Sequence, residues 1–285
     1  MSPEQTLAFF GGFAALFGLL LGSFLNVVIS RLPEDRSVAY PPSHCPACGH
    51  DIRWSDNIPV ISWLVLRARC RDCGNPISSL YPTIELLTGC LAWLLWRRIV
   101  PDPSALDLAH LTAFGVYLGF VCMLVAVTFI DIRHYIIPDE FSIYAVPLGV
   151  GASLLLTWLG YPEAVSWQQS VLGALAGGGT LLAIMGLWWL VRRQESMGLG
   201  DVKLLAMIGA FLGLAPAVPM VIVVSAVAGS LVGVPLALLT RRRLSLALPF
   251  GPFLALGAIA WLLHGPELME LYLHYVGRLY FLMVE

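Results

Sequence analysis

Charged residues are scarce in this sequence. Asp, Glu, Lys and Arg make up 12% of its 285 residues, whereas about 25% is usual in soluble domains. The 16 basic and 18 acidic side chains nearly cancel, and no long run of one sign occurs. A nucleic-acid-binding protein needs a basic patch or stripe, so we expect no nucleic-acid partner. With 58% hydrophobic residues, the composition predicts an integral membrane protein surrounded by the lipid bilayer.

A secretory signal sequence and a nucleotide-binding fingerprint are also missing. No basic residue precedes the first apolar run, residues 7–29, and its 23 uncharged residues exceed the roughly 7–15 of a secretory signal core. We therefore predict a retained transmembrane helix there. Nor does a glycine-rich nucleotide fingerprint follow a strand, because Gly173 and the glycines at 177–179 lie within an apolar segment, where they favour close helix packing.

Apolar runs of about membrane-spanning length recur along the chain. A transmembrane helix needs roughly 20 apolar residues, and we predict an all-α polytopic membrane protein with about eight such helices. The expected segments are residues 7–29, 78–96, 111–130, 141–160, 171–191, 204–217, 218–240 and 244–263. Only a short turn around Pro216 separates the sixth segment from the seventh, so seven helices with one kinked segment is an alternative.

The basic residues predict the orientation, because Lys and Arg concentrate in cytoplasmic loops. With a periplasmic N-terminus, thirteen of the 16 basic residues lie on the cytoplasmic side. Arg97, Arg98 and Arg278 lie on the other side, and we attribute the first two to snorkelling at a helix end. The cytoplasmic set comprises Arg31, Arg36, Arg53, Arg67, Arg69, Arg71, Arg133, Arg192, Arg193, Lys203 and the arginines at 241–243.

One polar insert interrupts the apolar pattern. It covers residues 31–77, between a first helix in residues 1–30 and a membrane bundle expected over residues 78–265. Residues 266–285 are expected to form an amphipathic tail on the outer surface. The predicted orientation places the insert in the cytoplasm. A unit of this size buries too little apolar surface to fold without a staple such as a metal.

Four cysteines in the insert form two Cys-x-x-Cys pairs: Cys45 with Cys48, and Cys70 with Cys73. Four thiolates on two tight turns suit tetrahedral zinc, and a site with four protein ligands has no open position for catalysis. We therefore predict a structural zinc site. Two disulfides or free thiols are alternatives, although the reducing cytoplasm argues against disulfides. His44 or His50 could also replace a ligand.

Two acids adjoin the apolar segments. Asp131 directly follows the segment at 111–130, and Asp201 ends the sequence Gly198-Leu-Gly-Asp near the start of the sixth segment. Ionisable groups at membrane depth are rare and usually functional. The predicted topology places both acids at the cytoplasmic face, where two close carboxylates would share a proton and could activate water for peptide hydrolysis. Gly198 and Gly200 would allow a peptide to approach Asp201 closely.

The acids also allow other interpretations. Asp139, which follows a proline, is expected to cap a helix or to belong to the same site, and Asp201 could also be a cap. Asp131 could pair with one of the arginines at 133, 192 and 193, and Lys203 is a candidate counter-charge. Glu85 lies inside an apolar segment, where it is either the partner of an arginine or part of a second site.

Longer motifs run the length of the chain: GSFLNVVISRLP at 22–33, the cysteine insert, WSDNIPVISW at 54–63, YPTIELLTG at 81–89, the acid at 131 with its IPD sequence at 137–139, and GLGDVK at 198–203. With these motifs the chain resembles the bifunctional type IV prepilin leader peptidases, which also act as N-methyltransferases.

The resemblance implies a GxGD-type aspartic peptidase of the bacterial inner membrane with Asp131 and Asp201 as catalytic acids. Its expected substrates are type IV prepilins and type II secretion pseudopilins, cleaved after a glycine at the cytoplasmic face. The resemblance also implies methylation of the new N-terminal residue by S-adenosylmethionine, with Glu85 and Gly89 as candidate residues. The intact cysteine insert is typical of the bifunctional form.

Two other functions compete with this one. A proton-coupled transporter could use the same two acids, but their expected place at one face differs from the midplane sites of transporters. A membrane scaffold could dock a cytoplasmic partner through a zinc-containing insert, but that function leaves the costly acids unexplained.

Overall fold

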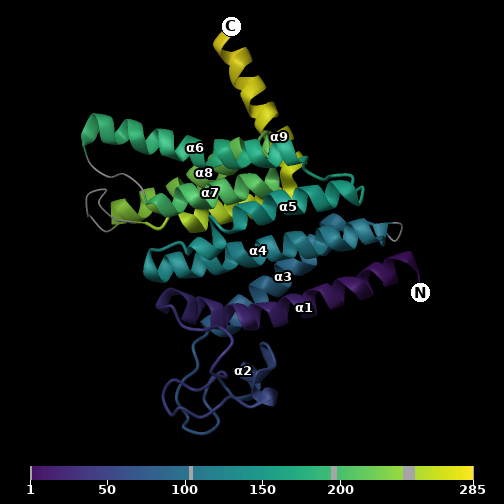
Figure 1. Ribbon diagram of the computed structural model, residues 1–285, viewed down its shortest axis with the longest axis vertical. Helices are drawn as coiled ribbons and strands as arrows, with labels where there is room; N and C mark the ends of the chain where they lie inside the picture. Colours follow the sequence, from purple (N-terminus) through teal and green to yellow (C-terminus); the bar gives the residue numbers. More distant parts are fainter. Residues whose placement is uncertain (1, 103–104, 194–197, 240–247, 285) are drawn as a thin grey trace. The chain divides into compact units, whose positions relative to one another are not determined.

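Figure 1 shows the computed structural model of the protein, which describes residues 2–102, 105–193, 198–239 and 248–284. These residues form helices joined by turns, with no β-strand among them, so the predicted all-α fold is confirmed. The chain divides into two compact units, Met1–His134 and Tyr135–Glu285.

The first unit contains three long helices: α1 (Pro3–Arg31), α3 (Leu80–Ile99) and α4 (Leu108–His134). Helix α1 begins at a capping box, in which the Ser2 hydroxyl accepts from the Gln5 N–H and the Gln5 side chain accepts from the Ser2 N–H. These bonds satisfy amide groups that a helix start otherwise leaves without partners. Each of the three helices packs against the other two.

Small residues bring α1 and α3 into close contact. A Cβ atom added to Gly22 would lie 2.7 Å from the Glu85 Cα atom, and one added to Gly18 would lie 2.5 Å from the Ala92 Cβ atom. Side chains any larger than glycine would force the two backbones apart. The Asn26 side chain adds a bond of 3.2 Å to the carbonyl of Tyr81, at the start of α3.

The insert between α1 and α3 is built mainly from turns. Its helical elements are η1 (Leu32–Glu34), η2 (Trp54–Asp56) and the five-residue α2 (Ile61–Val65). Figure 1 shows these short elements linked by irregular loops. Few of its side chains are buried, which agrees with the expectation that apolar burial alone is too small to hold it folded.

The second unit is organised around one short helix. Its elements are η4 (Asp139–Phe141), α5 (Ala145–Trp158), α6 (Trp167–Arg192), α7 (Leu199–Leu212), α8 (Ala217–Leu239) and α9 (Gly251–Val284). Helix α7 contacts each of the other four long helices. Its 14 residues would extend about 21 Å, less than the roughly 30 Å of the bilayer core. It is therefore an internal element of the unit.

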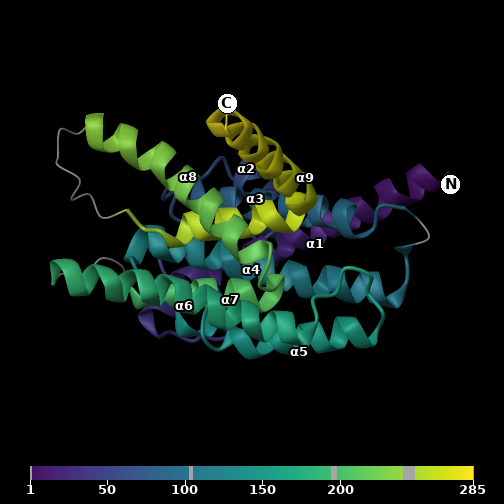
Figure 2. The same cartoon turned by 90° about the horizontal axis from the view of Figure 1, so that it is seen from above.

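Helices α6 and α7 run side by side in both views (Figures 1 and 2). Gly173 and Gly209 bring their backbones together, and Gly177 approaches the Leu205 carbonyl in the same way. The Ser170 hydroxyl donates to the Ala210 carbonyl across this interface at 2.6 Å. The expectation that these glycines serve close helix packing is confirmed for Gly173, Gly177 and Gly178 and is wrong for Gly179, where an added Cβ would have no neighbour within 4 Å.

The helix count agrees with the sequence. Eight helices of 14 or more residues occur among the described residues, and α7 and α8 are separate, so the kinked alternative is wrong. By length and composition, six helical segments can cross a membrane: α1, α4, the segment Asp139–Trp158 that contains η4 and α5, α6, α8 and α9. Helix α3 has a suitable length but carries Glu85, Arg97 and Arg98, which lower its hydropathy.

Two helices differ from the expected segments, and some residues of the charge count lie outside the described ranges. Helix α7 begins at Leu199, five residues before the expected start. Helix α9 runs to Val284 but departs from helical geometry at His264, just before Pro266. The arginines at 241–243, which entered the charge count, and the side chain of Arg278 lie outside the described residues.

The α6–α7 contact predicts a sharp difference between two neighbouring glycines. We expect Gly177→Val to destabilise the protein by roughly 1–3 kcal/mol, because the added carbons meet the backbone of α7. Gly179→Val is the matched control, since a Cβ there would have no neighbour within 4 Å. Thermal unfolding of purified protein in detergent measures both variants, and equal losses of stability would contradict this packing.

Candidate functional site

The four cysteines of the insert lie on two turns that are built alike. In the first, the Cys45 N–H donates to the His50 carbonyl and the Gly49 N–H donates to the Cys45 carbonyl, both at 2.9 Å. The second repeats these bonds around Cys70, at 2.8 and 2.9 Å. Gly49 and Gly74 have φ angles of 73° and 70°, a region that glycine enters without steric cost.

The two turns bring all four thiols together. Every pair of Sγ atoms among Cys45, Cys48, Cys70 and Cys73 lies within 4.8 Å, and the Cys45 and Cys73 sulfurs are 3.9 Å apart. Tetrahedral zinc with Zn–S bonds of about 2.3 Å requires sulfurs about 3.8 Å apart. The cluster therefore fits zinc with small adjustments. No disulfide joins these cysteines, and neither neighbouring histidine belongs to the cluster.

The thiols differ in how readily they lose a proton. The N–H groups of Cys48 and Ala47 point at the Cys45 sulfur and lower its pKa to about 6. At Cys73 the Asn75 N–H acts in the same direction, but burial and the neighbouring thiols outweigh it and raise the pKa to about 12. Four adjacent thiols cannot all ionise unless a cation binds among them, which is the role that zinc supplies.

An ion pair with a half-exposed arginine braces the insert next to the second turn. The Arg71 guanidinium donates two hydrogen bonds to the Asp56 carboxylate, from Nε to Oδ2 at 2.8 Å and from Nη2 to Oδ1 at 2.6 Å. This pairing lowers the pKa of Asp56 and joins η2 to the turn that starts at Cys70. The Trp63 indole N–H also donates to the Ile77 carbonyl at 3.2 Å, which holds α2 against the end of the insert.

Glu85 connects the insert to helix α3. Its carboxylate accepts a bond of 2.7 Å from the Val60 N–H, and the residue is 7% exposed. Val60 has a φ of 62°, a conformation that is strained for a β-branched residue. Its partner is a backbone amide, so of the two alternatives expected for Glu85 the arginine partner is wrong. Gly89, one turn further along α3, packs against the side chain of Leu19.

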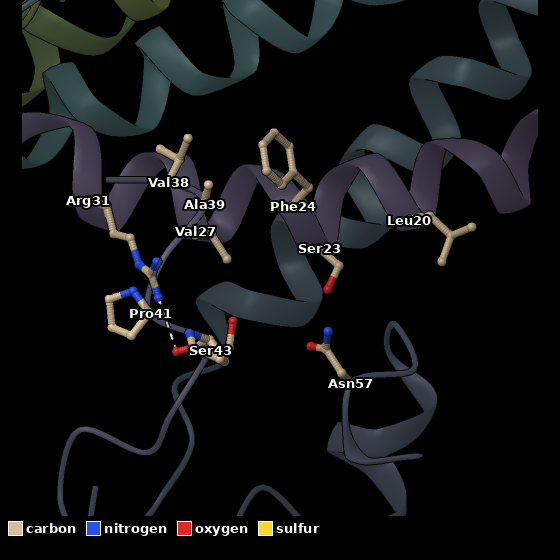
Figure 3. A pocket seen from close by; sticks show the side chains of 11 residues that line it. Leu20, Ser23, Phe24, Val27, Arg31, Val38, Ala39, Pro41, Ser43 and Asn57 are labelled. Carbon is tan, nitrogen blue, oxygen red and sulfur yellow. Dashed lines mark hydrogen bonds between the residues drawn. The ribbon is translucent and has the colours of Figure 1, made fainter. Parts of the chain in front are cut away.

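A cavity of about 310 Å³ lies between α1 and the first part of the insert (Figure 3). Its walls include the apolar side chains of Leu20 and Phe24 and the polar groups of Ser23, Asn57 and Arg31. The hydroxyl of Ser23 and the amide of Asn57 point toward one another in Figure 3. The motifs at 22–33 and 54–63 contain five of the lining residues, but the sequence alone did not indicate that these segments meet around a cavity.

Asp131 lies near the end of helix α4, which continues to His134. The residue is 5% exposed, and the preceding Ile130 is fully buried. The helix therefore extends four residues beyond the expected boundary and carries Asp131 within its last turn. The buried carboxylate agrees with the expectation that this acid is costly to retain.

Asp201 lies in the first turn of helix α7 and is 9% exposed. The helix begins after Gly198, so Asp201 lies inside it, and the alternative of Asp201 as its N-cap is wrong. The helix start leaves N–H groups exposed, which favours a negative charge nearby. A Cβ atom at Gly200 would lie 3.1 Å from the Ile137 Cβ atom, so the missing side chain allows the chain segment before η4 to pack here.

Asp139 forms an ion pair with Lys203, with 2.6 Å between Oδ1 and Nζ. It was expected to cap a helix or to belong to the peptidase site. The structure shows no side-chain cap bond at η4, and α5 begins only at Ala145, so the cap is wrong. The pair ties η4 to α7 two residues from Asp201, and it gives Lys203 a carboxylate partner other than the catalytic candidates.

The cysteine cluster predicts a metal-dependent insert. We expect about one zinc per chain by elemental analysis, lost in Cys48→Ser together with the protease resistance of the insert, because the metal closes the two turns. Cys90→Ser is the matched control, since Cys90 lies alone and exposed on α3. A metal-free wild type whose insert resists trypsin as well as the metal-loaded protein does would contradict the site.

Two family models match the chain. Residues 16–99 match the bacterial peptidase A24 N-terminal domain, which covers α1, the insert and α3. Residues 118–234 match the type IV leader peptidase family and contain both Asp131 and Asp201. The cysteine cluster and the cavity therefore lie in one matched region and the candidate acids in the other.

Curated relatives match most of the chain. The prepilin leader peptidase/N-methyltransferase of Aeromonas hydrophila is 39% identical, covering 90% of this chain and 92% of the relative. The protein of the same name from Burkholderia pseudomallei is 37% identical over 89% and 85%. The type 4 prepilin-like proteins leader peptide-processing enzyme of Escherichia coli is 37% identical over 87% and 91%. No solved structure matches the chain significantly. The chain belongs to the type IV leader peptidase family and includes its bacterial N-terminal domain.

Proposed function

We propose that this protein removes the leader peptides of type IV prepilins and then methylates the new N-terminus. The sequence Gly198-Leu-Gly-Asp at the start of α7, within the region that matches the peptidase family, carries the proposal. The names of the relatives support both activities. We extend the substrates to the pseudopilins of type II secretion, which share the leader implied by the resemblance.

Peptide hydrolysis is assigned to Asp131 and Asp201. In this mechanism the ionised Asp201 takes a proton from water, and the resulting hydroxide attacks the carbonyl carbon of the scissile bond. Asp131 donates its proton to the carbonyl oxygen. The C–N bond then breaks as the proton held by Asp201 passes to the departing amine, and one hydroxyl of the intermediate returns its proton to Asp131 as the carboxylic acid product forms. The position of Asp201 in the first turn of α7 suits the ionised partner.

Neighbouring residues support this site without reacting. Gly198 and Gly200 leave room for a substrate backbone beside Asp201. The Lys203–Asp139 pair holds η4 against α7, which fixes the turn that carries Asp201. Both acids lie within one turn of a helix end, whereas transporters place their ion sites at discontinuous helices near the midplane. This placement favours a peptidase over the transporter alternative.

The proposed orientation places the N-terminus in the periplasm and both acids at the cytoplasmic face. The distribution of basic residues supports it. It also places the insert of residues 31–77 in the reducing cytoplasm, where cysteines remain available for zinc. The leaders of prepilins are short and basic in the family that this chain resembles, and such leaders stay on the cytoplasmic side.

Methyl transfer is assigned to the N-terminal region. S-adenosylmethionine supplies a methyl group from its sulfonium, and the acceptor amine must lose a proton. We assign the removal of that proton to Glu85. This residue is buried, accepts a hydrogen bond from the Val60 N–H and lies at the junction of α3 with the insert. Gly89 keeps α3 close to α1. Zinc at the four cysteines would hold the insert in place and take no part in the reaction.

The assigned acids predict a clean loss of cleavage. We expect Asp131→Asn and Asp201→Asn each to lower cleavage of a prepilin at least about 10³-fold, because an amide can neither accept nor donate the required proton. Mass spectrometry of the substrate measures leader loss and the added methyl mass. Asp107→Asn, which changes an exposed acid before α4, is the matched control.

The same experiment separates the two activities. Protein with Asp201→Asn is expected to remain in the membrane at normal amounts and to methylate a prepilin supplied already cleaved. Cleavage that survives in either aspartate variant would overturn the assigned pair. Cleavage by the wild type without a methyl increment would overturn the assigned methyl transfer alone.

A further inference from the structure

Arg31 is a buried cation without an ionic partner. The residue is 8% exposed, and its guanidinium donates to the Ser37 carbonyl at 3.1 Å and to the Pro42 carbonyl at 3.3 Å. Within the described part of the chain no carboxylate pairs with it, and the nearby Glu34 is paired with Arg36. A buried charge is costly unless an opposite charge compensates it. This arrangement therefore calls for an anionic group from another molecule.

The guanidinium lines the cavity between α1 and the insert (Figure 3). The bonds to the two carbonyls use two of the five N–H donors of the guanidinium and fix the orientation of this group. Three donors remain for a ligand. Leu20, Phe24 and Val38 provide an apolar wall, and Ser43 and Asn57 add hydrogen-bonding groups. A volume of about 310 Å³ is at the lower end of the range for small-molecule sites. The cavity can hold a compact ligand that is partly apolar and carries one anionic group.

The place of the cavity narrows the choice of ligand. It lies in the region that matches the N-terminal domain, apart from the region that matches the peptidase family. Ser23 lines the cavity and its side chain also interacts with Glu85, so one side chain separates the cavity from the proposed proton acceptor. The methyl donor of the proposed reaction has a carboxylate, an amine and an aromatic adenosyl body.

We propose that this cavity binds S-adenosylmethionine, with the carboxylate of the donor paired to Arg31 and its adenosyl body against Phe24 and Val38. The inference rests on the proposed methyl transfer. Paired and bidentate contacts between arginine and carboxylate are among the stronger polar interactions. Arg31 acts here as a binding residue, and Glu85 keeps its separate role at the acceptor amine.

Direct binding measurements test this site. S-adenosylmethionine and its decarboxylated analogue are titrated against purified protein in lipid nanodiscs. In the wild type, we expect the analogue to bind roughly 10- to 100-fold more weakly, because it lacks the partner of Arg31. In Arg31→Gln, both ligands are expected to bind with the weaker affinity. Arg36→Gln, on the same segment but paired with Glu34, is the matched control and should discriminate as the wild type does.

A second variant guards against a folding defect in Arg31→Gln. Ala39→Phe leaves the arginine in place and fills the cavity from an exposed position of the insert, so it should weaken both ligands alike. Leader cleavage measures whether each variant is folded. Equal affinity of the wild type for both ligands, or discrimination that persists in Arg31→Gln, would overturn the inference while methyl transfer by the wild type stands. A wild type that cleaves but never methylates would instead remove the proposed function on which it rests.

Discussion

A charged side chain is costly to bury beside a membrane, and the described residues bury four of them: Arg31, Glu85, Asp131 and Asp201. In a chain with 12% charged residues, each is retained at the end of a long helix or at its junction with a loop. Exposed charges in the same structure form ordinary pairs, such as Arg36 with Glu34. The buried charges therefore mark the places where we assign chemistry.

The insert depends on contacts at both of its sides. The four cysteines of its two turns lie close together, and the Glu85 bond to Val60 and the Arg31 bonds to carbonyls hold its chain against α1 and α3. Close packing of α1 on α3 at Gly22 sets the position of Glu85. The α1–α3 contact and the bond between Glu85 and Val60 thus hold the insert beside the cavity, and zinc at the four cysteines would keep the two turns of the insert together.

Features with a short sequence signature could be predicted. Apolar length gave the helices, and the Cys-x-x-Cys spacing gave a cluster that fits zinc. The wrong expectations concern interactions between distant segments. Asp139 follows a proline as a cap does, yet it pairs with Lys203, 64 residues away. Glu85 was expected either to pair with an arginine or to belong to a second site, and a backbone amide binds it because Val60 adopts a positive φ angle that a β-branched residue does not favour. Arg31 belonged to the cytoplasmic charge count, and nothing local indicated its burial beside a cavity.

The central claim is that Asp131 and Asp201, one from each unit, act on one peptide bond. Cysteine cross-linking tests their proximity directly. Asp131→Cys and Asp201→Cys are combined in a protein with Cys90→Ser and Cys122→Ser, then treated with a short bifunctional reagent in native membranes. The account predicts a linked pair of peptides by mass spectrometry, formed less when a prepilin occupies the site. Ready labelling of each cysteine alone, with no linked peptide at any reagent length up to about 10 Å, would contradict it, since two carboxylates that share a proton must lie close together.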